Sequence, residues 1–378
     1  MKNRSKKIMA LLLTGVMSAG LLAGCGGNSA SNESQESAQE AAPAQEAGDA
    51  GAVEDEQAAE AAQTESADSG AASGEGIKIA FVPQLIGIPY FTAMEEGGNQ
   101  AAADLGVEFL YTGATQASAA EQVKIMDSLI KQGVNALSLS VLDSSSTNPY
   151  IEKAQEAGIV VYTSDSDAPD STRDFYVAQA LDEDLGRTLM DHLAAQIDEE
   201  GQIGIVSGES TATNLNTWIS FMEEQQKEKY PNIEIVDIRY TQGGSSEQAL
   251  KQAQELMTRY PDLKGLVAVA SSTIPGVAQA VQQEGKAGEV KVIGYGSPAT
   301  VKPFIDSGVM EESILWDAKE LGYLTVWAGA MAAQGKEFEE VNEIAGISNP
   351  VKWDAENKIL LLGEPLVITK DNVDSFDF

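Results

Sequence analysis

Two carboxylates, Asp165 and Asp167, follow directly after an apolar run that ends at Thr163. Ionised carboxylates accept strong, charge-assisted hydrogen bonds, so a carboxylate just past a buried strand can hold the vicinal hydroxyl groups of a ligand. Asp165 is the better candidate and Asp167 the weaker, and an exposed turn or a helix cap is the alternative for both. Glycoside hydrolysis would need two convergent carboxyl groups, and alternate residues of one loop seldom converge.

Amide and aromatic side chains follow the first apolar run, which stops at Val82. Gln84, Tyr90 and Phe91 occur there, at the start of a segment with helical spacing. Two aromatic rings at a helix start can stack on the apolar face of a sugar, and an amide both donates and accepts hydrogen bonds. We expect one of the two rings to lie in the core and the other to line a ligand cleft.

The second half of the chain offers small polar side chains at comparable positions. Asn214 and Asn216 lie where an apolar run passes into a helix, and a pair of amides there suits a neutral polar ligand. Thr213 or Asn214 is also a natural helix N-cap, and capping is the alternative explanation for either residue. Ser271 follows a later strand in a stretch of small and polar residues.

Trp316 and Asp317 end a short apolar segment that begins at Ser313. An indole at the end of a strand is either a second stacking wall of the cleft or a structural residue at a crossing between two lobes. We include both residues among the candidate ligand-binding positions.

Catalytic and metal-binding patterns are missing from the sequence. No Gly-x-Ser-x-Gly elbow, no Gly-x-Gly-x-x-Gly after the first strand and no Walker loop occurs. The single histidine, His192, lies in the middle of a segment with helical spacing, and Cys25 is the single cysteine, so a His/Cys metal centre is excluded. We therefore expect no enzyme activity, no metal and no cofactor.

The elements that position these residues alternate between short apolar runs and helix-period segments. Such a series predicts an α/β fold with two doubly wound parallel-sheet lobes, because right-handed crossovers place helices on both faces of a parallel sheet. Ligands of such sheets bind outside the carboxyl ends of the strands. Strands are expected at 77–82, 107–111, 136–141, 159–163, 203–207, 233–239, 265–270, 290–295 and 313–316, and helices at 90–106, 119–132, 149–157, 184–196, 213–229, 247–259, 275–284 and 321–333.

The first residues of the chain have the features of a secretory signal: a basic start, a short apolar core and small residues before a cleavage site. The apolar run 8–23 is shorter than the roughly 20 residues that span a bilayer comfortably. Its end, Leu22-Ala23-Gly24-Cys25, resembles the bacterial lipobox, in which the cysteine thiol receives diacylglycerol. The alternative is an ordinary signal peptide with a chance cysteine.

The stretch 26–76 contains no lysine, arginine or aromatic residue and carries acidic side chains from Glu33 to Glu75. It lacks the apolar surface that would offset the entropy of folding, so we expect an extended acidic linker or a solvated tail without function. The formal net charge of the chain is −34, which argues against nucleic acid as a partner.

The segments 79–83, 88–91, 160–165, 260–265 and 292–295 together resemble type I periplasmic sugar-binding proteins, the ribose-binding superfamily, over essentially all of 77–378. The segments 164–167, 315–317 and 363–373 are most similar to its autoinducer-2-binding and rhamnose-binding branch. This resemblance implies a hinge of three crossovers and closure around one small ligand. The expected division is a signal peptide at 1–24, an acylated cysteine and linker at 25–76, a first lobe of 77–180 plus 317–345, and a second lobe of 181–316 plus 346–378.

The resemblance also implies which positions contact the ligand. Several of them depart from the autoinducer-2 pattern: Gln84 stands where a lysine is expected, and Asn214-Leu215 replaces an Asp-Gln pair. The expected Pro-Asp-Ala stretch reads Val269-Ala270-Ser271. The ribose pattern has an arginine at Ser166 and an aspartate at Gly296. The implied contacts are Gln84, Tyr90, Phe91, Asp165, Asn214, Leu215, Val269, Ala270, Ser271 and Trp316.

The resulting hypothesis is an extracellular solute-binding lipoprotein that delivers a monosaccharide-like ligand to an ABC permease. It would be a monomer, anchored through Cys25 to the outer face of the cytoplasmic membrane of a Gram-positive-like cell. The alternatives are an autoinducer-2 receptor, a partner that presents a sugar to a membrane sensor, and an exported sugar-processing enzyme.

Overall fold

The computed structural model describes residues 76–378. The predicted signal peptide 1–24, the predicted acylation site Cys25 and the predicted linker up to residue 75 lie outside the described residues, so these stay predictions. Among residues 76–378, no helix combines the length and the apolar character needed to span a membrane.

The first sheet is built on strands that are buried from both sides. In β1 (Lys78–Val82), the four residues from Ile79 to Val82 are all buried. A parallel strand covered by helices on both faces has such a continuous apolar run rather than an alternating one. In spatial order the strands are β11 (Val341–Asn342), β12 (Val351–Asp354), β13 (Ile359–Leu361), β5 (Tyr176–Ala178), β4 (Val160–Ser164), β3 (Ala136–Leu139), β1 and β2 (Glu108–Tyr111).

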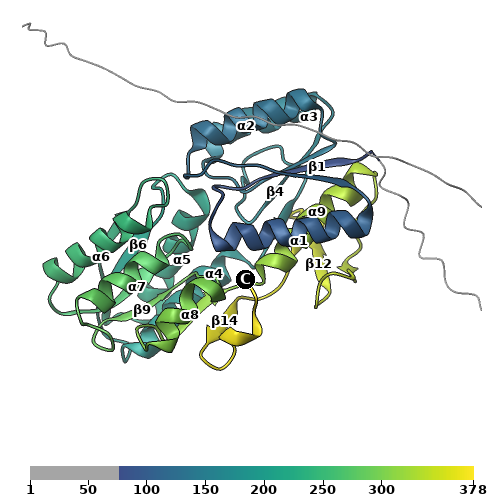
Figure 1. Ribbon diagram of the computed structural model, residues 1–378. Coiled ribbons are helices and arrows are strands. Elements are labelled where there is room, and N and C mark those ends of the chain that lie inside the picture. Colours follow the sequence, from purple (N-terminus) through teal and green to yellow (C-terminus); the bar gives the residue numbers. More distant parts are fainter. Residues whose placement is uncertain (1–75) are drawn as a thin grey trace, which may run out of the picture. The chain divides into compact units, whose positions relative to one another are not determined.

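Within this sheet, the strands from β13 to β2 run parallel, and β11 and β12 are antiparallel additions at one edge. In Figure 1, one pair of helices lies over one face of the sheet and another pair over the opposite face. The first pair is α2 (Ala119–Gln132) and α3 (Ser144–Glu156), and the second is α1 (Pro89–Leu105) and α9 (Ala318–Ala333).

Helices α1 and α9 approach closely because glycines face the contact. A Cβ atom on Gly97 would lie 1.9 Å from the carbonyl oxygen of Lys319, and one on Gly322 would lie 2.0 Å from that of Met94. Both distances are shorter than any real carbon–oxygen contact, so only glycine fits at this crossing. Packed together in this way, α1 and α9 cover the face of the first sheet that lies opposite α2 and α3.

The second sheet has four parallel strands in the order β7-β6-β8-β9 among the described residues. Helices cover both of its faces, α4 with α5 on one and α6 with α7 on the other, as Figure 1 shows. A separate antiparallel pair, β10 with β14, joins the edge through a bridge between Tyr295 and Ile314. The elements are α4 (Asp182–Gln196), β6 (Gly201–Ser207), α5 (Thr213–Lys229), β7 (Ile233–Tyr240), α6 (Ser246–Arg259), β8 (Leu263–Ala268), α7 (Ile274–Gln283), β9 (Lys291–Gly294), α8 (Pro298–Asp306), β10 (Glu312–Leu315), β14 (Leu366–Thr369) and a final 3-10 turn (Val373–Ser375).

The α/β class with two doubly wound lobes is therefore confirmed, and the chain passes between the two sheets three times. The passages follow β5, β10 and β13. The predicted assignment of 346–378 to the second lobe is wrong for its first half, because β12 and β13 belong to the first sheet and β13 pairs with β5 in parallel. Only the part from β14 onward lies with the second lobe.

Most helices lie within a few residues of their predicted bounds, and α2 and α5 match them. The helix predicted at 149–157 begins earlier, at Ser144. Asp143 caps it, since its carboxylate accepts a hydrogen bond of 3.0 Å from the backbone N–H of Ser145. Pro149 lies inside this helix rather than at its start, so proline was a misleading start signal here.

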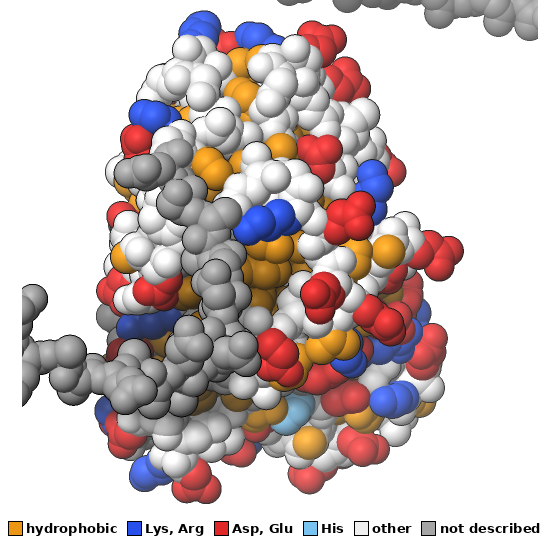
Figure 2. All heavy atoms as spheres, turned by 90° about the vertical axis from the view of Figure 1, so that its right-hand side faces the viewer, with side chains coloured by type: hydrophobic (Ala, Val, Ile, Leu, Met, Phe, Trp, Pro, Cys, Tyr) orange, Lys and Arg blue, Asp and Glu red, His pale blue; other side chains and the backbone are white. Residues whose placement is uncertain are grey.

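The surface has an apolar groove beside the antiparallel edge of the first sheet. Leu181 and Val341 in its wall are 43% and 48% exposed, which is unusual for large apolar side chains. Figure 2 shows hydrophobic side chains in a hollow on the face that it views, with acidic and basic side chains around it. The other apolar members of the groove are Trp353, Ile359 and Leu361.

Candidate ligand-binding cleft

A cavity lies where the carboxyl ends of strands from both sheets meet, as expected for this fold class. Its volume is about 50 Å³, well below the roughly 300–1,000 Å³ that is usual for small-molecule sites. A larger ligand therefore enters only when the lobes or the lining side chains move apart. The cavity is lined by Gln84, Leu85, Ile88, Tyr90, Phe91, Asp165, Asn214, Leu215, Trp218, Val269, Ala270, Ser271, Ser272, Tyr295 and Trp316.

Asp165 is the charged group of this cavity and follows β4 directly. Its backbone adopts a left-handed conformation with a φ of 70°, which aspartate tolerates better than most residues. The side chain is 4% exposed, and its carboxylate accepts hydrogen bonds from the hydroxyls of Tyr90 and Ser140. Burial raises the pKa of Asp165 to about 6, although these two hydrogen bonds act in the opposite direction.

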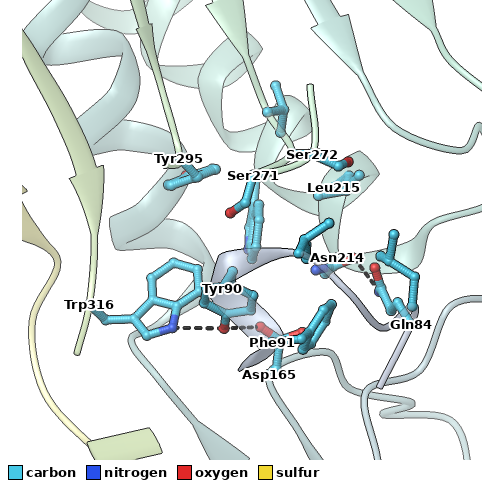
Figure 3. A pocket seen from close by; sticks show the side chains of 15 residues that line it. Gln84, Tyr90, Phe91, Asp165, Asn214, Leu215, Ser271, Ser272, Tyr295 and Trp316 are labelled. Atoms are coloured by element: carbon cyan, nitrogen blue, oxygen red, sulfur yellow. Dashed lines mark hydrogen bonds between the residues drawn. The ribbon is translucent and has the colours of Figure 1, made fainter. Parts of the chain in front are cut away.

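Tyr90 and Trp316 extend this carboxylate into a hydrogen-bonded chain that crosses the cleft. The indole Nε1 of Trp316 donates to the Tyr90 hydroxyl at 2.9 Å, and that hydroxyl donates to Asp165, as Figure 3 shows. The chain links the start of α1 in the first lobe to the end of β10. Trp316 therefore belongs to the site as well as to the passage between the lobes.

Gln84 and Asn214 make a second contact across the cleft. The Nε2 atom of Gln84 donates to the Asn214 Oδ1 atom at 3.2 Å and to the Val141 carbonyl oxygen at 3.0 Å. Asn214 is not the N-cap of α5, because Ala212 holds that position without a side-chain hydrogen bond. The amide of Asn214 is therefore available to the cleft, and the capping alternative for Thr213 and Asn214 is wrong.

The structure brings together most of the residues that the sequence singled out. Tyr90 and Phe91 both line the cavity, and both are buried, so the expected division into one core ring and one cleft ring does not hold. The candidates that line the cavity are Gln84, Tyr90, Phe91, Asp165, Asn214, Leu215, Ser271 and Trp316.

Three candidates lie outside this cavity, and each has another role. Asp167 forms a buried ion pair with Arg173, whose Nη2 atom lies 2.6 Å from the Asp167 Oδ2 atom. The amide of Asn216 donates to the carbonyl oxygen of Ser210 at 2.9 Å, within its own loop. Asp317 caps α9 by accepting from the backbone N–H of Glu320 at 2.9 Å.

Residue patterns and the family resemblance together missed five members of the lining. Leu85 and Ile88 lie in the loop before α1, and Ser272 neighbours the predicted Ser271. Trp218 and Tyr295 fit the apolar spacing of a helix and of a strand, so their aromatic rings gave the same signal as ordinary core residues. The one usable signal was the position of Tyr295 at the carboxyl end of its strand, where this fold class binds ligands.

The side chains that line the cavity suit a neutral, partly apolar ligand. One carboxylate, two amides and two serine hydroxyls supply hydrogen bonds, and no lysine or arginine is among the described residues that line the cavity. Aromatic and aliphatic side chains make up the rest, which is typical of small-molecule sites. Across residues 76–378, no group of three His, Cys, Asp or Glu side chains is arranged to hold a metal ion.

The fold and this cleft define a two-lobed binding protein, and comparison with known proteins identifies its family. The family described as Periplasmic binding protein domain matches residues 79–337, which is more than half of the chain. The chain therefore belongs to this family.

Individual relatives cover most of the described residues. The chain is 28% identical over 251 residues to a D-ribose/D-allose-binding protein of Pseudomonas aeruginosa, covering 63% of this chain and 76% of that one. Among solved structures, LsrB from Clostridium saccharobutylicum in complex with AI-2 is 27% identical with a TM-score of 0.74, covering 80% of this chain and all (100%) of the other. A sugar ABC transporter structure from Actinomyces odontolyticus is 31% identical with a TM-score of 0.63, covering 80% and 98%.

Proposed function

We propose that this chain is the solute-binding protein of an ABC importer and that its cleft captures a neutral, monosaccharide-sized polyol. The relative from Pseudomonas aeruginosa is a D-ribose/D-allose-binding protein, and the similar structure from Actinomyces odontolyticus is that of a sugar ABC transporter. Attachment to the outer face of the cytoplasmic membrane through a lipid on Cys25 is part of the same proposal.

One observation carries this proposal: polar groups from both lobes converge on a single cavity lined with aromatic rings. Gln84 and Asp165 come from the first lobe, and Asn214 and Ser271 from the second. Figure 3 shows Gln84 directed toward Asn214 and Asp165 directed toward Tyr90. A polyol that hydrogen-bonds to both sets holds the lobes together, and the rings of the lining offer apolar faces against which it can pack.

The charge of the lining favours a neutral ligand over an anion. Asp165 is buried beside hydroxyl donors only, and a ligand carboxylate or phosphate brought next to it would meet an uncompensated like charge. The aliphatic side chains Leu85, Ile88 and Leu215 add apolar surface, which suits a deoxysugar better than a fully hydroxylated hexose.

Reception of autoinducer-2 is the second candidate function. Its support is the structural similarity to LsrB in complex with AI-2, at 27% identity. A protein that presents its ligand to a membrane sensor would use the same cleft. Whether binding leads to import or to signalling depends on the membrane partner.

A ligand screen by thermal unfolding tests the proposal. The panel contains pentoses, hexoses, deoxyhexoses and autoinducer-2, with an amino acid and a sugar phosphate as matched charged controls. A true ligand at 100 times its Kd adds about 2.7 kcal/mol to the free energy of unfolding, so the melting temperature rises clearly. If a charged control raises it and no polyol does, the proposed ligand class is wrong.

A further inference from the structure

Tyr295 is an aromatic residue of the cleft whose hydroxyl has no hydrogen-bond partner. The residue is 1% exposed, lines the cavity and follows β9 directly. Its Oη atom is buried, and none of the residues 76–378 donates to it or accepts from it. A buried hydroxyl without a partner destabilises a protein, so such groups call for an explanation.

The ring of Tyr295 is held firmly in this position. Trp218 packs edge-on against it with centroids 4.7 Å apart, and Trp316 lies 5.9 Å away. Trp218 is fixed in turn, because its Nε1 atom donates to the carboxylate of Asp182 at 2.6 Å. The neighbouring rings therefore fix the position of the Tyr295 hydroxyl before any ligand binds.

The protonation of Tyr295 suits a hydrogen-bonding role. Burial, together with the nearby charge of Asp182, holds the pKa of Tyr295 well above its usual range. The phenol stays neutral at every physiological pH and keeps its proton. It can therefore both donate and accept, which matches the hydroxyl groups of a polyol.

We propose that the Tyr295 hydroxyl is a ligand-contacting group that recognises one hydroxyl of the bound polyol and so contributes to specificity. This inference rests on the proposed function, since it requires a hydroxylated ligand in the cleft. In the ligand-bound protein the hydrogen bond satisfies a group that is otherwise buried without a partner. A ligand that lacks this hydroxyl leaves Tyr295 unsatisfied and is discriminated against.

The test compares Tyr295→Phe with the control Tyr111→Phe. Tyr111 also has a buried hydroxyl without a partner among the described residues, but it lies in β2 and does not line the cavity. Both variants remove one oxygen and keep the ring. The probes are D-ribose, D-allose and L-rhamnose with their monodeoxy analogues, titrated by calorimetry into the full chain.

We expect Tyr295→Phe to weaken binding of at least one sugar about tenfold, which corresponds to 1.4 kcal/mol, and Tyr111→Phe to leave it unchanged. The monodeoxy analogue that lacks the contacted hydroxyl should bind the wild type and Tyr295→Phe equally. Without ligand, Tyr295→Phe should be at least as stable as the wild type, whereas a purely structural role predicts a loss of stability.

Two outcomes would overturn the inference, and they distinguish a wrong role for Tyr295 from a wrong proposed function. If the wild type binds the probes and Tyr295→Phe binds each of them equally well, the role of Tyr295 is wrong and the proposed function stands. If the wild type binds none of the sugars, the proposed function fails and the inference fails with it.

Discussion

Trp316 and Tyr90 are 226 positions apart in the sequence and are joined by a hydrogen bond of 2.9 Å, with their rings perpendicular and 5.7 Å apart. The same Tyr90 hydroxyl donates to Asp165. A single hydroxyl thus connects the carboxylate of the first lobe to the indole at the passage between the lobes. A ligand hydroxyl that takes the place of Tyr90 at Asp165 also changes the surroundings of the indole, which couples binding to the hinge.

Asp167 should matter for stability and not for ligand affinity. Replacing Asp167 with Ala leaves Arg173 charged, buried and unpaired, which we expect to lower the free energy of unfolding by about 3–5 kcal/mol. Chemical denaturation measures this loss. The double variant Asp167→Leu with Arg173→Met should recover most of it, because it removes both charges. A tenfold loss of affinity in a folded Asp167 variant would restore Asp167 to the ligand site.

Two buried carboxylates near the cleft, Asp165 and Asp182, should make the free energy of unfolding fall as the pH rises. Ligand affinity should change in the opposite direction. Burial raises the pKa of Asp165 and that of Asp182 to about 6, above the value of about 3.9 in the unfolded chain. Between these pH values the folded state binds more protons than the unfolded one, so this contribution to stability is present at low pH and is lost as pH rises toward 6. Ligand affinity should instead fall below about pH 6, where Asp165 becomes protonated.

Comparison with Asp165→Asn isolates this effect. Because the amide does not titrate, the stability of the variant relative to the wild type should increase from about pH 4.5 to 7.5, as measured by denaturation at each pH. A difference that stays constant over this range would show that Asp165 has an ordinary pKa in the folded state.

The single histidine offers a direct check on the contact between α4 and β10. His192 Nδ1 lies 2.8 Å from the Glu312 carboxylate, and this hydrogen bond raises the pKa of His192 above 6.5. Nuclear magnetic resonance follows the titration without ambiguity, since the sequence has one histidine. Glu312→Gln should lower the pKa, and Glu311→Gln, which alters an exposed neighbour, should not. An unchanged pKa in Glu312→Gln would contradict the contact.

The crossing of α1 and α9 should tolerate no side chain larger than a hydrogen atom. Gly322→Ala places a methyl group against the Met94 carbonyl oxygen, so we expect a loss of about 3 kcal/mol or more in the free energy of unfolding. Gly363→Ala is the matched control, because nothing lies within 4 Å of its added Cβ atom. Equal stability of the two variants would mean that the helices are farther apart than described.

The sequence predicts the strands β1–β4 and β6–β10, every helix except α8, and the edge at which the cleft lies, because periodicity and strand ends are local properties. It does not predict α8 or the short strands β5 and β11–β14. It does not predict the pairing of Asp167 with Arg173, since two polar residues in one loop give no sign that both will be buried. The predicted assignment of 346–378 to the second lobe is likewise wrong for the part that forms β12 and β13. Which sheet these strands join depends on their pairing with β5, far from them in sequence.

Tyr295 illustrates the same limit within the site. Its strand is a continuous apolar run, and an aromatic residue at the end of such a run looks like part of the core. Only the packing of Trp218 and Trp316 around it shows that the hydroxyl is buried in the cleft without a partner.

The measurement that tests the central claim most directly is a calorimetric titration of the wild type and Asp165→Asn with the sugar that most stabilises the wild type. We predict saturable binding of one neutral polyol per chain, with affinity reduced at least about tenfold in Asp165→Asn, because a charge-assisted hydrogen bond contributes roughly 1.5–3 kcal/mol. Binding of the same sugar with equal affinity by both proteins would contradict a ligand site centred on Asp165.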